Sequence, residues 1–139
     1  MNSIEKLNLL LDQIEEASLL RQNNINRVSK LYKILNLEQK NPDISTLFEY
    51  AAINLAGIGL REEDFGEIRE GRYVQIIAID YEIINDKKKT RNSSLGYYGK
   101  AEKLEKDLKK YIIEFVLRWR YEKSFQHSDH YKQLLAKIT

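Results

Sequence analysis

Residues 71–84 read Gly-Arg-Tyr-Val-Gln-Ile-Ile-Ala-Ile-Asp-Tyr-Glu-Ile-Ile, and this stretch decides the fold class. Its β-branched and aromatic side chains favour a strand. Its length of about 14 residues is long for a strand and ordinary for a buried helix. The sequence shows no second convincing strand, and a lone strand would leave its backbone N–H and C=O groups unpaired. The sequence therefore predicts a central buried helix at 71–84, with a strand as the alternative.

The segments on either side have the apolar spacing of amphipathic helices. Ser3 is the expected N-cap of the first helix, and Gln22-Asn23-Asn24 are expected to end it. Asn41 and Pro42 suit the start of a third helix, which would end before Gly57. The expected helices cover residues 3–20, 25–37, 42–56, 71–84, 98–125 and 129–137.

The predicted fold is all-α, a compact bundle of five or six helices in a single domain over residues 1–139. Between two of these helices, the polar and basic residues 85–96 are predicted to form a flexible loop. Trp119 lies in the apolar stripe of the helix at 98–125, so its side chain is expected in the core.

The composition excludes several function classes. The chain has 139 residues and no cysteine, which rules out disulfides, iron–sulfur clusters and thiol catalysis. No apolar run reaches the roughly 18 residues that a membrane span needs, so we expect no membrane partner and a cytoplasmic location. The spacing of His127, Asp129 and His130 matches no strong metal signature, and no metal site or cofactor is predicted.

Charge is distributed unevenly along the chain. Residues 1–83 carry 9 Lys/Arg and 14 Asp/Glu, whereas residues 84–139 carry 14 Lys/Arg and 7 Asp/Glu, so a net charge of +2 hides an acidic half and a basic half. A basic surface attracts polyanions such as nucleic acid. The alternative is that the two halves neutralise each other in the fold.

The basic half suggests a phosphate-binding surface. On a helix at 98–125, Lys103, Lys106 and Lys110 lie nearly opposite the apolar stripe and form a basic ridge. The alternative is an ordinary solvated surface with i,i+4 ion pairs. Tyr97 and Tyr98, beside the basic loop, are candidates for stacking on bases. The predicted nucleic-acid-binding residues are Lys87, Lys88, Lys89, Arg91, Lys100, Lys103, Lys106, Lys110, Arg118 and Arg120.

A helical bundle of this size, with one basic ridge and no catalytic set, resembles the small subunits of CRISPR effector (Cascade-type) complexes. The resemblance implies a non-catalytic subunit that contacts the backbone of guide RNA or of the target strand. It also implies other protein subunits, including further copies of the same chain, as partners.

Two other function classes have support in the sequence. Arg120 and His127 resemble the Arg-x(4–6)-His motif of HEPN ribonucleases, in which histidine acts as acid or base and arginine stabilises the phosphate. The acidic stretch at 61–70 fits an immunity protein, antitoxin or adaptor that faces a basic partner. These remain the enzymatic and the protein-binding alternatives.

Overall fold

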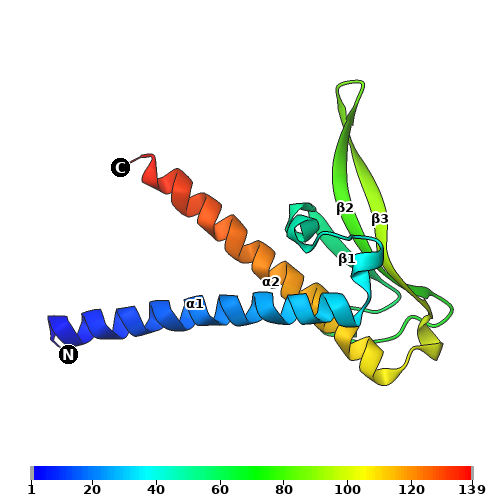
Figure 1. Cartoon of the computed structure of the whole chain (residues 1–139), viewed down its shortest axis with the longest axis horizontal. Helices are drawn as coiled ribbons and strands as arrows, with labels where there is room; N and C mark the ends of the chain where they lie inside the picture. The colour runs from blue at the N-terminus through cyan, green and yellow to red at the C-terminus, as the bar shows by residue number, and fades with distance from the viewer. Residues whose placement is uncertain (1, 139) are drawn as a thin grey trace.

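The computed structural model describes residues 2–138, which form an α+β fold of two long helices and a three-stranded antiparallel sheet (Figure 1). The prediction of an all-α bundle is therefore wrong. The strand order in the sheet is β1-β2-β3. The helices are α1 (Ser3–Ile34) and α2 (Lys106–Ala136), and the strands are β1 (Ala52–Ala56), β2 (Tyr73–Ile84) and β3 (Lys87–Lys100). Short 3₁₀ helices are η1 (Leu37–Gln39), η2 (Ile44–Glu49), η3 (Glu62–Asp64) and η4 (Ala101–Lys103).

The predicted helix at 71–84 is instead the central strand β2. It pairs with β3 from Tyr73↔Lys100 to Ile84↔Lys87, so residues predicted to be a loop supply the missing hydrogen bonds. Asn85 and Asp86, with φ of 52° and 61°, form the two-residue turn. Left-handed residues at both positions give the turn a twist that matches its strands. The expected loop at 85–96 is thus a tight turn followed by most of β3.

The first predicted break is absent, since α1 runs without interruption through Gln22-Asn23-Asn24. Asn24 is buried, and its amide donates to the backbone oxygen of Arg118 (2.9 Å) and accepts from the Arg118 guanidinium (3.1 Å). These tertiary contacts outweigh the low helix propensity of asparagine. The N-cap is Asn2 rather than Ser3, in a capping box with Glu5.

Two further helix boundaries differ from the prediction. The expected helix at 42–56 is divided into η2 and β1, which place Leu47 and Ile53 separately in the core. The expected helices at 98–125 and 129–137 are one helix, α2, which begins at Lys106. Asp129 does not cap a new helix but bonds to Arg21 of α1 across the helix pair.

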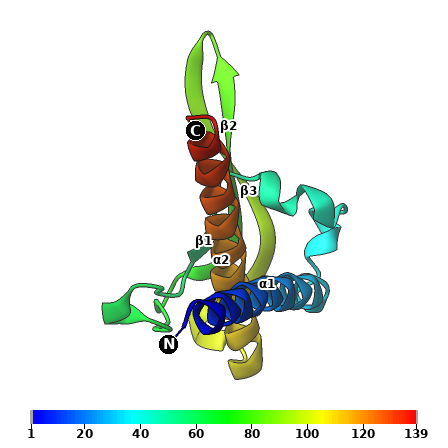
Figure 2. The same ribbon diagram turned by 90° about the vertical axis from the view of Figure 1, so that its left-hand side faces the viewer.

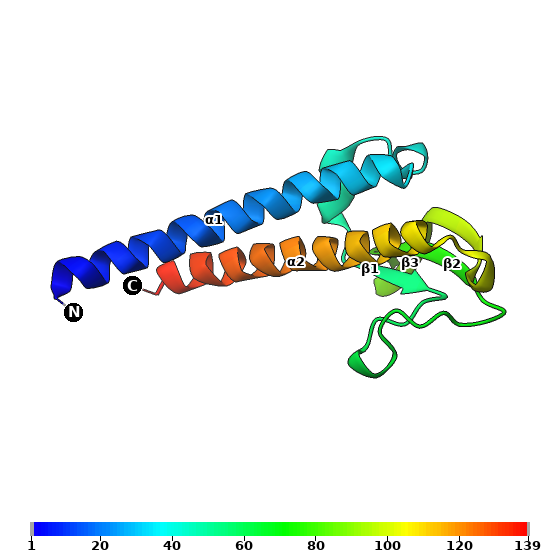
Figure 3. The same cartoon turned by 90° about the horizontal axis from the view of Figure 1, so that it is seen from below.

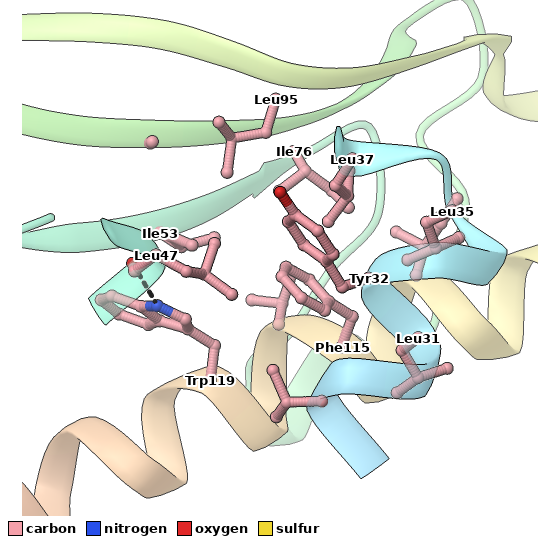
Figure 4. Packing of buried hydrophobic residues seen from close by; sticks show 14 of the residues in the cluster. Leu31, Tyr32, Leu35, Leu37, Leu47, Ile53, Ile76, Leu95, Phe115 and Trp119 are labelled. Carbon is pink, nitrogen blue, oxygen red and sulfur yellow. Dashed lines mark hydrogen bonds between the residues drawn. The ribbon is translucent and has the colours of Figure 1, made fainter. Parts of the chain in front are cut away.

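The core lies where the C-terminal half of α1, the middle of α2 and the inner face of the sheet meet (Figure 4). Trp119 is 2% exposed, which confirms its predicted place in the core, and its indole N–H donates to the Leu47 carbonyl at 3.0 Å. Both helices extend far beyond this core as antiparallel neighbours (Figure 3). They diverge toward the two termini, while the β2–β3 hairpin projects clear of them (Figures 1 and 2).

Candidate nucleic-acid interface

One face of the sheet forms the candidate site. It is turned away from the helices except at the edge strand β1, where the Asn54 side chain accepts a hydrogen bond from Arg120 of α2 at 3.3 Å. Side chains alternate along a strand, and Val74, Ile76 and Ala78 point into the core. The intervening residues of β2 and their partners on β1 and β3 therefore point outward. We call this surface the open face; its residues are Ala52, Asn54, Ala56, Tyr73, Gln75, Ile77, Ile79, Tyr81, Ile83, Lys88, Thr90, Asn92, Ser94, Tyr97 and Lys100.

The open face contains no Asp or Glu, although acidic residues are frequent in the chain. The carboxylates of β2, Asp80 and Glu82, occupy the alternate positions and point to the helix side. Lys88 and Lys100 remain on the open face as its charged residues. Its charge is therefore positive at both ends, with Lys88 near the hairpin tip and Lys100 at the other end, which suits a polyanion.

Three tyrosines are exposed on the open face. Tyr73 and Tyr97 are 48% and 59% exposed, and their rings lie side by side with centroids 5.8 Å apart. Near the hairpin tip, the Lys88 ammonium lies 4.0 Å from the centroid of the Tyr81 ring. Exposed aromatic rings next to cations are the arrangement on which single-stranded bases stack.

A cavity of about 580 Å³ lies at the end of the open face farthest from the hairpin turn, where Ala56, Tyr73 and Gln75 form part of its wall. Arg69 and Arg72 line the same cavity. Arg69 bonds to Asp64 at 3.3 Å, and the Arg72 side chain is exposed. Two guanidinium groups beside Tyr73 provide the donors that a phosphate group requires.

Gly57, on the wall of this cavity, has φ of +89°, and a Cβ there would lie 2.8 Å from the Tyr73 carbonyl. Only glycine therefore brings the backbone this close to β2 without strain.

The structure separates the predicted basic residues of the hairpin. Lys88 lies on the open face, whereas Lys87, Lys89 and Arg91 point to the helix side, because neighbouring residues of a strand face opposite ways. Arg91 bonds to Glu82 at 3.2 Å, and Glu82 is also the cross-strand partner of Lys89. The cluster at 87–91 is thus not one continuous patch.

The other predicted residues fall into two groups. Lys100, Lys103, Lys106 and Lys110 are exposed where β3 leads through η4 into α2, and Lys100 belongs to the open face. Glu102 lies among them, and hydrogen bonds from its own N–H and that of Gly71, with the charges of Lys100 and Lys103, lower its pKa.

Arg118 and Arg120, by contrast, already have partners within the chain. Arg118 bonds to Glu114 at 2.6 Å and to Asn24. Arg120 donates twice to the Ile53 carbonyl, at 3.2 and 3.1 Å, and burial lowers its pKa. Both guanidinium groups hold α2 to its neighbours, so we leave them out of the interface.

Strand alternation also separates the two tyrosines predicted to stack. Tyr97 points outward, whereas Tyr98 points inward and its hydroxyl donates to the Leu35 carbonyl at 3.2 Å. Burial raises the pKa of Tyr98 to about 12. The sequence reasoning missed Tyr73, Tyr81, Arg69 and Arg72. The signal that could have found the two tyrosines is the Asn85-Asp86 pair after a β-branched run, because Asn and Asp tolerate the left-handed conformation of a hairpin turn. No sequence signal indicates the two arginines.

The HEPN-like pair lies on one side of α2. Arg120 and His127 both line a cavity of about 280 Å³ beside β1, together with Lys123 and Ser124. The Arg120 guanidinium is directed to β1 by the bonds described above. Nothing tests whether this pair has ribonuclease activity, which stays a prediction. Within residues 2–138 no group of three or more His, Asp or Glu side chains is placed to hold a metal ion.

The acidic stretch 61–70 forms η3 and the loop that leads to β2. Glu62, Glu63, Glu67 and Glu70 are exposed, and Asp64 accepts hydrogen bonds from Arg61 and Arg69. A basic protein partner for this loop also stays a prediction.

An ion-pair network fastens α1 to α2 beside the core and makes part of the stability depend on pH. Arg27 and Arg118 both bond to Glu114, and these bonds, that of Arg27 above all, lower its pKa below the ordinary 4.5. The ionised carboxylate therefore stabilises the fold above pH 4.5, and this contribution is lost as the pH falls through the lowered pKa.

We expect Glu114→Gln to reduce stability at pH 7 by less than about 1 kcal/mol, since the groups are partly exposed. The difference from wild type should shrink as the pH falls below 4.5. Urea unfolding at a series of pH values measures it. Glu63→Gln is the matched control, because it makes the same change at an exposed carboxylate away from the helix pair. A Glu114→Gln effect that is constant down to pH 2 would contradict the assignment.

Comparisons with protein families, with curated sequences and with solved structures gave no match. Among the described residues, neither α1 nor α2 carries an apolar stretch sufficient to cross a lipid bilayer. A functional proposal therefore rests on the geometry of the open face.

Proposed function

We propose that this protein is a non-catalytic binder of single-stranded nucleic acid, which it holds on the open face. The observation that carries the proposal is the absence of carboxylates from a sheet face that exposes three tyrosines and two lysines. Bases would stack on Tyr73, Tyr97 and Tyr81. The arginine-lined cavity and the lysines from Lys100 to Lys110 would contact the phosphates at one end.

Single-stranded rather than double-stranded nucleic acid fits this surface. Stacking needs unpaired bases whose rings are accessible, and tyrosines on an open sheet serve that purpose in other single-strand binders. Contacts to phosphates and ring faces carry little sequence information, so we expect weak base preference.

The wider context stays a prediction. The resemblance to CRISPR small subunits relied on an all-helical bundle, which this chain is not, so the proposal no longer depends on it. Membership of a ribonucleoprotein assembly with guide RNA or a target strand stays a prediction, as does a cytoplasmic location.

The test is the affinity for a fluorescent oligo(dT) or oligo(U) strand, measured by anisotropy. Tyr97→Ala should weaken binding roughly 5- to 150-fold, because one stacked base contributes about 1–3 kcal/mol. Tyr97→Phe is the matched control, which keeps the ring and should keep the affinity. Unchanged binding by Tyr97→Ala would contradict the open-face site, as would a failure of the wild-type protein to bind either strand.

Substitutions in the basic ridge show whether binding depends on the lysines rather than on the tyrosines of the open face. Replacing Lys103, Lys106 and Lys110 with Glu should weaken binding equally across sequences and lower the salt slope by about 0.7 per lost phosphate contact. Loss of all binding here, with Tyr97→Ala unaffected, would replace the open face with a purely electrostatic ridge. Cleavage of the RNA probe that disappears in His127→Ala would favour the HEPN alternative.

A further inference from the structure

The N-terminal part of α1 extends into solvent with apolar residues exposed. Every residue from 3 to 20 is exposed, and we call this segment the arm. Helices in proteins gain most of their stability from packing an amphipathic face, and a large exposed apolar patch marks an interaction surface. The large apolar side chains of the arm, each at least 47% exposed, are Ile4, Leu7, Leu9, Leu10, Leu11, Ile14, Leu19 and Leu20.

The accessible surface of the whole chain is larger than that of a folded monomer. A 16.4 kDa monomer is expected to expose about 7,500 Å². This chain exposes 10109 Å², an excess of roughly 2,600 Å². A permanent homodimer buries about 1,000–2,500 Å² on each partner. The arm and the projecting β2–β3 hairpin both contribute to this excess, which is as large as the area that one protomer of a stable dimer buries.

The neighbouring helix of the same chain does not offer the arm an apolar surface. The side of α2 that faces α1 is marked by Glu122 and Asp129, which both bond to Arg21. The exposed apolar residues near the end of α2 lie about 130–170° around the helix from that side. Closing α1 onto its own α2 would therefore bring leucines against polar residues. Those exposed residues are Tyr131, Leu134, Leu135 and Ile138.

The two exposed helix surfaces match each other in spacing. On the arm, Ile4, Leu7, Leu11 and Ile14 recur at alternating intervals of three and four residues. On α2 and just beyond it, an outer stripe has the same spacing, interrupted only by two serines. This interval produces knobs-into-holes packing between helices. We define the outer stripe as Leu117, Tyr121, Ser124, Ser128, Tyr131, Leu135 and Ile138.

The arm and the helix segment that carries the outer stripe have opposite net charges. The arm carries four carboxylates and one lysine, a net charge of −3 over residues 3–20. Residues 120–138 carry four Lys/Arg and two Asp/Glu, a net charge of +2 with both histidines neutral. Complementary charge favours an encounter between these two surfaces and opposes an arm-on-arm contact.

We propose that two copies of this chain form a two-fold dimer in which the arm of each copy packs along the outer stripe of the other. The two-fold axis makes both contacts identical, so the assembly closes at two copies. The proposal does not depend on nucleic-acid binding, because the open face lies on the sheet and not on these helix ends.

Sedimentation equilibrium at micromolar concentration provides the first test, with an expected mass of twice 16.4 kDa. Leu11→Asp combined with Ile14→Asp should give a folded monomer, since both side chains are exposed in the single chain. Gln13→Glu adds a charge to the same arm on the side of the helix away from Ile4, Leu7, Leu11 and Ile14, and should remain dimeric. A monomeric wild-type protein would overturn the proposal, and so would a dimer that the double substitution leaves intact.

A charge-reversal mixing experiment tests whether the arm of one copy binds the outer stripe of the other copy. In one variant, Glu15→Lys with Glu16→Lys makes the net charge of the arm positive. In a second variant, Lys132→Glu with Lys137→Glu makes the net charge of residues 120–138 negative. Each variant alone would place like charges together and dissociate more readily than wild type. Mixed, they should form a heterodimer as stable as wild type, because both contacts regain opposite charges. A mixture no more associated than its components would overturn the arm-on-stripe arrangement.

Discussion

Trp119→Ala is expected to destabilise the protein by about 3–5 kcal/mol, the cost of removing a large aromatic side chain from a packed core. Trp119 is 2% exposed and stacks on Phe48, with ring centroids 6.1 Å apart and planes 8° apart. Its indole N–H also bonds to Leu47 of η2. The substitution thus leaves a cavity and an unsatisfied carbonyl, and it removes one of the contacts between η2 and α2; the Lys123 bond to the Phe48 carbonyl remains.

The measurement is urea unfolding followed by circular dichroism at a fixed protein concentration. Trp119→Phe should cost less, since it retains the aromatic ring stacking and loses mainly the hydrogen bond. Ile83→Ala is the control on an exposed position, 80% exposed at the hairpin tip, and should stay within about 0.5 kcal/mol of wild type. A Trp119→Ala loss under about 1 kcal/mol would show that this core is not formed as described.

Arg21→Met is expected to cost about 3–5 kcal/mol, because it leaves the Glu122 carboxylate buried without its partner. Glu122 has a side chain only 3% exposed, and it accepts from Arg21 at 2.8 Å. Arg21 also bonds to Asp129 at 2.7 Å, so one guanidinium joins two turns of α2 to α1. The bonds to Glu122 and Asp129 raise the pKa of Arg21.

The double variant Arg21→Met with Glu122→Met tests the cause of that loss. Both charges are then gone, and well-packed apolar side chains often replace a buried pair without loss of stability. We expect the double variant to regain most of the stability that Arg21→Met loses. If the double variant instead loses as much free energy of unfolding as Arg21→Met and Glu122→Met lose together, the two side chains do not stabilise each other.

The candidate site was predictable only in part, and the reason is strand alternation. The sequence drew attention to lysines from Lys87 to Lys110, and two of these, Lys88 and Lys100, lie on the open face. It could not show that Lys88 and Lys89 face opposite ways, because this depends on the residues being in a strand. Tyr73 and Tyr97 are 24 positions apart in the sequence and become neighbours only through the pairing of β2 with β3.

Local pattern by itself determined that two long segments are helical and that Trp119 is buried, since both follow from spacing along one chain segment. Only the tertiary structure decided the state of residues 71–100, because a strand is stable when a distant segment supplies its hydrogen bonds. The partner strand β3 has few apolar residues, because its outer half is exposed on both faces. Its sequence therefore lacks the alternation of apolar and polar residues that would predict a strand. In the same way, Arg118 satisfies the buried Asn24 and lets α1 continue where its own sequence predicts an end.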